Sequence, residues 1–264
     1  MYTFFYFYVI LKNMNKKNFK SFVKSINLFE IIWLSSTIIT LVLLSFLLPD
    51  IMFEDKSNVS IVICSVITIV CSPIVEILIS KQCRWWTIFS IVFVELTDIV
   101  VLISLGVYSS ALISLLFWIP VDIVTFITWG KHKDEQRKEM TKVKSFGVKW
   151  NILIVLGMCA TGFLLGLILK SLPNSEMSFV IAFSNVFEIC NGIFLITRHD
   201  EQWFAWFGYL ICEIIMWIAL GHYIMLVTVL SMMINTIYGI IKWKLYIKNK
   251  QNLNIELEKQ EKEQ

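Results

Sequence analysis

Eight apolar segments, each long enough to cross a membrane as one helix, constrain the fold of this chain more than any other feature. They span residues 27–49, 58–80, 85–105, 108–129, 149–170, 178–197, 202–220 and 222–243. A membrane-crossing helix needs about 20 mostly apolar residues. Hydrophobic residues make up 57% of the chain, against roughly 45–50% in an ordinary soluble domain. We therefore expect an all-α integral membrane protein with no room for an ATPase or kinase domain.

Basic residues predict how these helices are oriented. If the N-terminus is cytoplasmic, 21 of the 23 Lys and Arg residues fall on the cytoplasmic side, and only Lys56 and Lys170 fall outside. Membrane proteins concentrate basic residues in their cytoplasmic loops. The sequence therefore predicts a multi-pass protein with both termini in the cytoplasm and the lipid bilayer as its surroundings. The polar C-terminal tail is expected to be a solvated helix or a disordered end.

An internal repeat divides the chain. Each repeat has a charged inner turn with tryptophans, a Gly-x-Tyr outer turn and a closing Trp: KQCRWW at 81–86, GVY at 106–108 and Trp129, then RHDEQWFAW at 198–206, GHY at 221–223 and Trp243. One helix between the repeats reverses the chain once, so both have the same orientation, as in transporters built from parallel repeats. Taken singly, such residues are also typical of interfacial belts and turns.

The repeat predicts a 3+1+3 core with one extra N-terminal helix. Its parts are a cytoplasmic tail (1–26), the extra helix (27–49), the first repeat (58–129), a cytoplasmic loop (130–148), a linker helix (149–170), the second repeat (178–243) and a cytoplasmic tail (244–264). Pro73 and Pro120 interrupt two helices of the first repeat, where kinks are natural hinges.

Acidic residues inside the predicted spans indicate a polar interior. We single out six: Glu76, Glu95, Asp98, Asp122, Glu188 and Glu213. Exposing all six to lipid would cost about 15–20 kcal/mol, so they must face the bundle interior or a wet cavity. Glu76 is close enough to the inner end to reach toward Lys81 or Arg84. The others have no basic residue at matching depth, which suits a cationic ligand.

One face of the 202–220 segment combines aromatic rings with a carboxylate. Trp203, Trp206, Glu213 and Trp217 follow helical spacing, and Tyr209 flanks them. Such a face can hold a flat cationic ring by stacking and cation–π attraction, at about 0.5–2 kcal/mol per ring. The competing interpretation is that Trp203 and Trp206 are interfacial belt residues, which does not suit Trp217 near the other end.

Other polar positions extend this candidate binding site. Asn185, Glu188 and Asn191 form a stripe on the preceding segment, where interhelical hydrogen bonding is an equal alternative. Asn235 and Tyr238 share a face of the last segment and could contact ligand hydroxyls. Glu95 and Asp98 share another face, where two carboxylates in a low dielectric should hold one proton, for coupling or for structure.

Motifs of catalysis and metal binding are absent from the sequence. It has no Walker A motif, HExxH, nucleophile elbow or CxxC, and its three histidines fall in loops or at a turn. The six cysteines are interpreted as small hydrophobic residues. We therefore expect no enzyme, no catalytic residue, no metal, no cofactor and no nucleic-acid partner.

Several motifs of the second half resemble one transporter family. The run 203–206 (WFAW), the turn 221–223 (GHY) and the run 235–243 (NTIYGIIKW) resemble the PnuC family of nicotinamide riboside transporters, and the first half resembles its other repeat more loosely. The resemblance covers residues 58–250 and carries the family's WxxW pair onto Trp203 and Trp206 and its tyrosine onto Tyr238. The chain departs from the family at three positions. Leu210 stands where the family has Asn or Asp, and Gly192 and Ser114 each stand where the family has Gln.

Membership would imply a SWEET-like fold in a bacterial inner membrane. It would also imply facilitated diffusion of nicotinamide riboside, a cationic vitamin precursor for NAD biosynthesis, trapped inside by a cytosolic kinase. A homotrimer is compatible with the resemblance. Thiamine is the second substrate candidate, and a receptor that binds without transport and an intramembrane enzyme using Glu95 and Asp98 are the rival classes.

Overall fold

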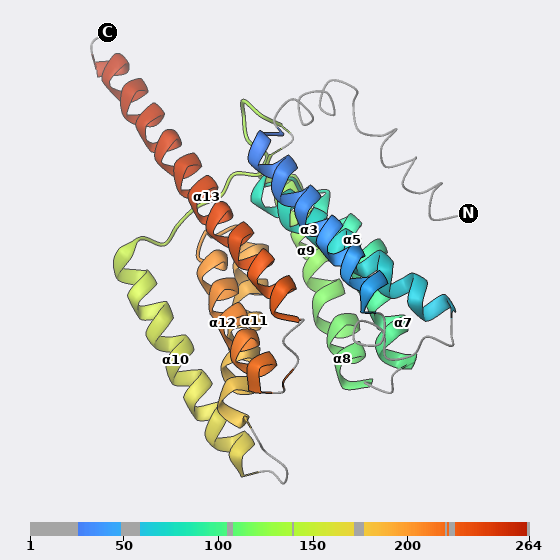
Figure 1. Ribbon diagram of the computed structural model, residues 1–264. Helices are drawn as coiled ribbons and strands as arrows, with labels where there is room; N and C mark the ends of the chain where they lie inside the picture. The colour runs from blue at the N-terminus through green and yellow to red at the C-terminus, as the bar shows by residue number, and fades with distance from the viewer. Residues whose placement is uncertain are drawn as a thin grey trace. The chain divides into compact units, whose positions relative to one another are not determined.

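The computed structural model describes residues 26–48, 59–104, 108–138, 140–171, 177–219, 221 and 225–262, and the helices account for most of them (Figure 1). The elements are α3 (Leu28–Leu47), α5 (Val59–Ser80), α6 (Trp86–Ser90), η1 (Ile91–Glu95), α7 (Leu96–Ser104), α8 (Tyr108–Ile113), η2 (Ser114–Trp118), α9 (Ile119–Lys131), α10 (Val148–Lys170), α11 (Ser178–Thr197), α12 (Gln202–Ala219) and α13 (Met225–Lys262). Within these ranges the chain forms isolated β-bridges but no strand.

Eight helical stretches of the described chain are long and apolar enough to span a membrane, which confirms an all-helical multi-pass protein. Their bounds agree with the predicted segments to within about three residues, except at the last one. That segment was expected to end near residue 243, but α13 continues to Lys262. Its extension is rich in Lys, Glu, Gln and Asn, residues that favour a solvated helix, and Figure 1 shows α13 reaching well beyond the ends of α11 and α12.

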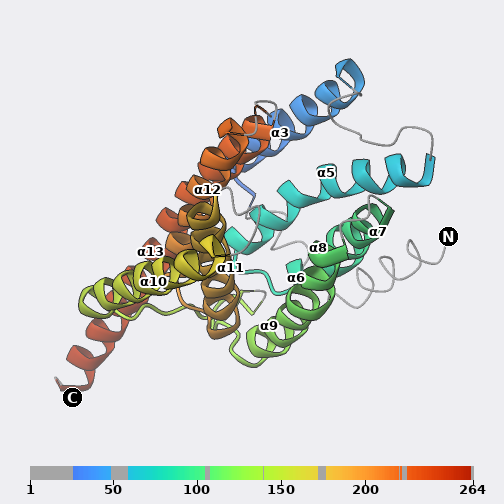
Figure 2. The ribbon, with the colours of Figure 1, turned by 90° about the horizontal axis from the view of Figure 1, so that it is seen from below.

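The chain divides into two compact units, one ending at Thr141 and the other beginning at Lys142. In unit 1, α5 packs against α3 and α7, and α6 packs against α9. In unit 2, α10 packs on α11, α11 on α12, and α12 on α13. Figure 2 shows α10 running along α11 within the second unit.

Small residues let the helices of unit 2 approach closely. A Cβ at Gly162 or Gly166 of α10 would overlap the rings of Phe183 or Phe179 on α11, and one at Gly208 of α12 would touch Phe187. Without a hydrophobic driving force in lipid, such small-residue contacts are a main source of helix association. The spacing of Gly162 and Gly166 thus fixes where α11 docks.

Helix geometry in unit 1 is less regular. The spans 86–104 and 108–131 each contain a π-helical turn, η1 and η2, which the sequence analysis did not anticipate. Pro120 is the second residue of α9, the helix that directly follows η2, whereas Pro73 lies inside α5, which continues to Ser80. The hinge role of both prolines stays a prediction.

Candidate functional site

The predicted aromatic face lies on α12, where Trp206 stacks on Tyr209. The two rings are 4.8 Å apart between centroids with planes 13° from parallel. Both side chains are half-buried, and the indole nitrogen of Trp206 has no hydrogen-bond partner among the described residues. Aromatic rings stack favourably on a further flat ring, so this pair is a candidate platform for an aromatic ligand.

A carboxylate adjoins this stack. The indole of Trp217 donates a hydrogen bond to Glu213 Oε2 at 2.9 Å, one turn apart on α12. Glu188 of α11 interacts electrostatically with both Glu213 and Tyr209. Two carboxylates and three aromatic rings from α11 and α12 therefore belong to one cluster in unit 2, an arrangement that favours a positively charged aromatic ligand.

Trp203 has different surroundings from Trp206. Its side chain is 1% exposed and lies edge-on to Trp243, with centroids 5.6 Å apart. A Cβ at Gly239 of α13 would overlap the Trp203 indole, so the ring packs directly on the α13 backbone. Trp203 thus joins α12 to α13 as a packing residue, and its predicted contact with substrate stays a prediction.

The remaining predicted residues of the second half lie on the flanking helices. Asn191 is 4% exposed and its Oδ1 has no hydrogen-bond partner within the described chain. Asn235 is fully buried on α13. Tyr238, half-buried on the same helix, has the Lys242 ammonium 5.3 Å from its ring centroid. None of these placements by itself shows a ligand contact.

The predicted residues of the first half lie in the other unit. Glu95 is the last residue of η1 and Asp98 lies in the first turn of α7. The carboxylate on which Glu95 acts is that of Asp122 on α9, a pairing that the shared face of Glu95 and Asp98 did not suggest. The sequence analysis recognised Glu95 as an acid within a span, but it did not predict the π-helical turn that orients the Glu95 side chain.

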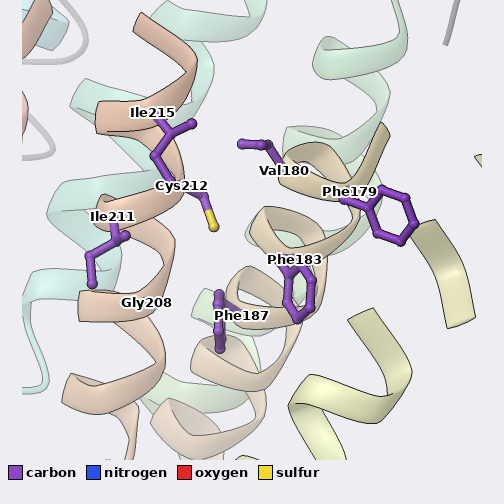
Figure 3. Close-up of a pocket in the computed structure, with 8 residues that line it drawn as sticks. All are labelled: Phe179, Val180, Phe183, Phe187, Gly208, Ile211, Cys212 and Ile215. Carbon is purple, nitrogen blue, oxygen red and sulfur yellow. The ribbon is translucent and has the colours of Figure 1, made fainter. Parts of the chain in front are cut away.

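A pocket of about 280 Å³ opens between α11 and α12, and it does not coincide with the predicted site. Figure 3 shows its lining, which is apolar: Phe179, Val180, Phe183, Phe187, Gly208, Ile211, Cys212 and Ile215. A pocket without a charged or hydrogen-bonding side chain offers a cationic nucleoside no orienting contact. The polar cluster around Glu213 is the better candidate for binding.

The turn between α11 and α12 is clamped by the segment 142–146. Lys144 exchanges backbone hydrogen bonds with Arg198 (3.0 Å) and Asp200 (2.9 Å). Glu201 Oε1 accepts hydrogen bonds from Ser145 Oγ at 2.8 Å and from the Phe146 N–H at 2.9 Å. The sequence analysis did not predict these contacts, because nothing in the residues 142–146 indicates which distant segment they bind.

Burial in this clamped turn shifts two ionisable groups in opposite directions. Burial, with help from Lys144 and Arg198, lowers the pKa of His199 to about 4, although Glu201 opposes it. Burial and the neighbouring Glu201 carboxylate raise the pKa of Asp200 to about 6. The His199 ring also stacks on Phe146 at 3.7 Å, within 5° of parallel.

The corresponding turn of unit 1 is held by an ion pair. Lys81 Nζ lies 2.8 Å from Glu30 Oε2, and both side chains are almost fully buried. The predicted partner of Lys81 was Glu76, and Glu30 was not among the acids singled out. The Asn27-x-x-Glu30 capping box that orients Glu30 at the start of α3 was readable in the sequence.

Within the described chain no group of three or more His, Cys, Asp and Glu side chains could hold a metal ion, and all six cysteines are free. The free cysteines agree with their interpretation as small hydrophobic residues.

Comparison with known proteins identifies relatives of the chain. The family model described as nicotinamide mononucleotide transporter matches residues 62–245. A crystal structure described as that of the vitamin B3 transporter PnuC is similar, with a TM-score of 0.63 and 21% sequence identity over 85% of this chain and 94% of that chain. No curated protein sequence matches significantly. The matched family and fold are those of transporters rather than enzymes.

Proposed function

Since the chain belongs to the nicotinamide mononucleotide transporter family, we propose that it imports a small cationic, nucleoside-like vitamin precursor by facilitated diffusion, with nicotinamide riboside as the first candidate. The observation that carries this proposal is the cluster of unit 2: the Trp206–Tyr209 stack beside the Glu213–Trp217 pair. Stacked rings hold the pyridinium by cation–π attraction, and the carboxylates balance its charge.

The same cluster favours a nucleoside over a nucleotide. Glu188 and Glu213 contribute negative charge where the ring would bind, and a phosphate would be repelled by them. We therefore infer that the 5′-phosphate is absent from the cargo and that a cytosolic kinase adds it after entry, which traps the product. Asn191 and Asn235 would orient the ribose hydroxyls.

Two packing features support a 3+1+3 repeat of the SWEET type. Trp86 lies edge-on to Trp129 at 5.9 Å in unit 1, as Trp203 does to Trp243 in unit 2. Gln82 and Arg198, at the ends of α5 and α11, are both left-handed, with φ of 57° and 63°. We propose that rocking of one triplet against the other exposes the site alternately, in a bacterial inner membrane with both termini cytoplasmic. A homotrimer is compatible with this arrangement.

Uptake by variants tests the aromatic site directly. Trp206→Ala should lower uptake of nicotinamide riboside at limiting concentration about tenfold, since the lost stacking and cation–π energy amounts to about 1–2 kcal/mol. The matched control is Trp150→Ala, because Trp150 is an exposed tryptophan on α10 and should leave uptake unchanged. If Trp206→Ala and the wild type take up nicotinamide riboside equally at matched expression, the site is not at Trp206.

Thermal stabilisation of the purified protein separates the candidate cargoes. A ligand at 100 times its Kd stabilises the folded state by about 2.7 kcal/mol, so nicotinamide riboside should raise Tm where thiamine and uncharged nucleosides do not. Stabilisation by thiamine alone would move the substrate to that vitamin. Stabilisation by nicotinamide riboside without any flux in liposomes would favour a receptor that binds without transport.

A further inference from the structure

Unit 1 contains two π-helical turns near the middle of adjacent spans. η1 (Ile91–Glu95) packs against η2 (Ser114–Trp118) and also against α9. π-helical turns are rare and frequently occur at functional sites. Proline at 120 lacks the backbone N–H with which an α-helix would bond to the preceding turn, which is consistent with the irregular turn η2 just before it. The corresponding spans of unit 2 are regular α-helices, so the two π-helical turns are a property of unit 1 and not of the repeat.

Beside these turns lies a buried carboxylate without a hydrogen-bond partner. Asp122 is 1% exposed, and neither of its carboxylate oxygens has a partner among the residues that the structure describes. It lies nine residues before Lys131, the end of α9, or about 13 Å at 1.5 Å per residue. The Asp122 side chain is too short to place its charge at the membrane interface from this depth.

The groups around Asp122 are acidic or neutral. Ser90 of α6 and Glu95 of η1 are the side chains that act on it. The elements packed against α9 are α6, η1 and η2, and Glu95 is the single charged residue in their sequences. The Arg84 guanidinium lies over the Phe126 ring at 4.8 Å and against Gly130, toward the end of α9.

A second negative charge beside a buried carboxylate makes the ionised pair unstable without a counter-charge. We propose that Asp122, with Ser90 and Glu95, forms a binding site for a monovalent cation, H⁺ or Na⁺, in the middle of unit 1. The Ser90 hydroxyl and the carboxylate oxygens are hard oxygen ligands of the kind Na⁺ accepts, and a proton would neutralise the same oxygens. The three residues of this site belong to unit 1, whereas those of the aromatic cluster belong to unit 2.

Infrared titration of the full-length protein in detergent tests this site without any vitamin substrate. In Na⁺-free buffer at pH 7, a bound proton appears as the carbonyl stretch of a protonated carboxyl group. That band should be lost in Asp122→Asn and kept in Glu256→Gln, which removes an exposed carboxylate of α13. If Na⁺ is the ion instead, Tm should rise with NaCl but not with choline chloride, and Asp122→Asn should abolish the difference.

A wild-type protein with neither the protonated band nor the Na⁺ effect overturns the proposal, as does a band or an effect that Asp122→Asn leaves intact. Should Asp122→Asn fail to fold, Asp122→Glu keeps the charge and should shift the band rather than remove it, whereas an unmoved band counts against the site. Because cation binding is measured without cargo, failure of this site and failure of the proposed function can be recognised separately.

Discussion

The two units solve the same packing problem with different chemistry at their turns. Both place one tryptophan edge-on to another, Trp86 to Trp129 and Trp203 to Trp243. Yet the turn after α5 is held by the buried Lys81–Glu30 ion pair, whereas the turn after α11 is held by hydrogen bonds from the 142–146 segment to Glu201 and its neighbours. The edge-on tryptophan pairs are therefore common to both units, whereas the polar contacts that hold the turns differ between them.

The division extends to the acids inside the membrane. Unit 1 places Asp122 and Glu95 beside two π-helical turns and the Ser90 hydroxyl. Unit 2 places Glu213 and Glu188 beside stacked rings. An acid beside aromatic rings suits an organic cation, whereas an acid beside a hydroxyl suits an inorganic one. The comparison thus assigns different ligands to the two units.

The largest difference should follow from removing one negative charge at each turn. Glu30→Gln leaves the buried Lys81 ammonium without its partner, and breaking a buried ion pair costs about 3–5 kcal/mol. Glu201→Gln keeps an oxygen that accepts the Ser145 and Phe146 hydrogen bonds and weakens them by about 1 kcal/mol. Thermal unfolding in detergent measures both. Equal costs would mean that the ion pair is as replaceable as the hydrogen bonds, which would remove the proposed contrast.

A smaller difference is expected at two glycines that face large side chains. A Cβ at Gly239 would overlap the rigid Trp203 indole, so Gly239→Ala should cost about 1–3 kcal/mol of unfolding free energy. In unit 1, Gly130 is contacted by the end of the Arg84 side chain. That side chain can swing away, so Gly130→Ala should cost little. Gly157→Ala is the control, because its Cβ would meet nothing within 4 Å. A costly Gly130→Ala would show that Arg84 is fixed in place.

Replacing one tryptophan of each edge-on pair by phenylalanine should lower the stability of the protein by the same amount in either unit. The indole nitrogens of Trp86 and Trp203 have no hydrogen-bond partner in the described chain, so a phenylalanine at either position loses ring contacts but no hydrogen bond. We expect Trp86→Phe and Trp203→Phe to lower stability by a similar amount, about 1 kcal/mol. Unequal losses measured by thermal unfolding would count against equivalence of the two pairs.

Hydrophobic length predicted the eight spans because a membrane helix must satisfy its backbone internally and cover its sides with apolar residues. Periodicity also predicted that Trp206, Glu213 and Trp217 share a face, and the structure joins the last two by a hydrogen bond. These successes concern residues close together on one helix. Their geometry depends on the helix alone.

Contacts between distant segments could not be predicted in the same way. A π-helical turn has the same composition as an α-helical one, so η1 and η2 left no trace in the hydrophobic pattern, and the direction of Glu95 toward Asp122 followed from them. The clamp of Glu201 by Ser145 and Phe146 joins residues 55 and 56 positions apart. The packing of the Trp203 ring on the α13 backbone depends on the position of Gly239, which the spacing along one helix does not give.

The smallest effect should be that of pH on the turn of unit 2, because two groups oppose each other there. His199 has its pKa lowered from 6.5 to about 4, so this group loses stabilising effect as pH falls below about 6.5, when the unfolded state binds the proton first. Asp200 has its pKa raised from 3.8 to about 6, so this group adds stability as pH falls through 6, when the folded state binds the proton first. Asp200→Asn should therefore lose Tm relative to the wild type between pH 7 and pH 5, and His199→Gln should gain it. Parallel curves for all three proteins would show that neither group is buried enough to matter, and the turn of unit 2 would then differ from that of unit 1 in its hydrogen bonds alone.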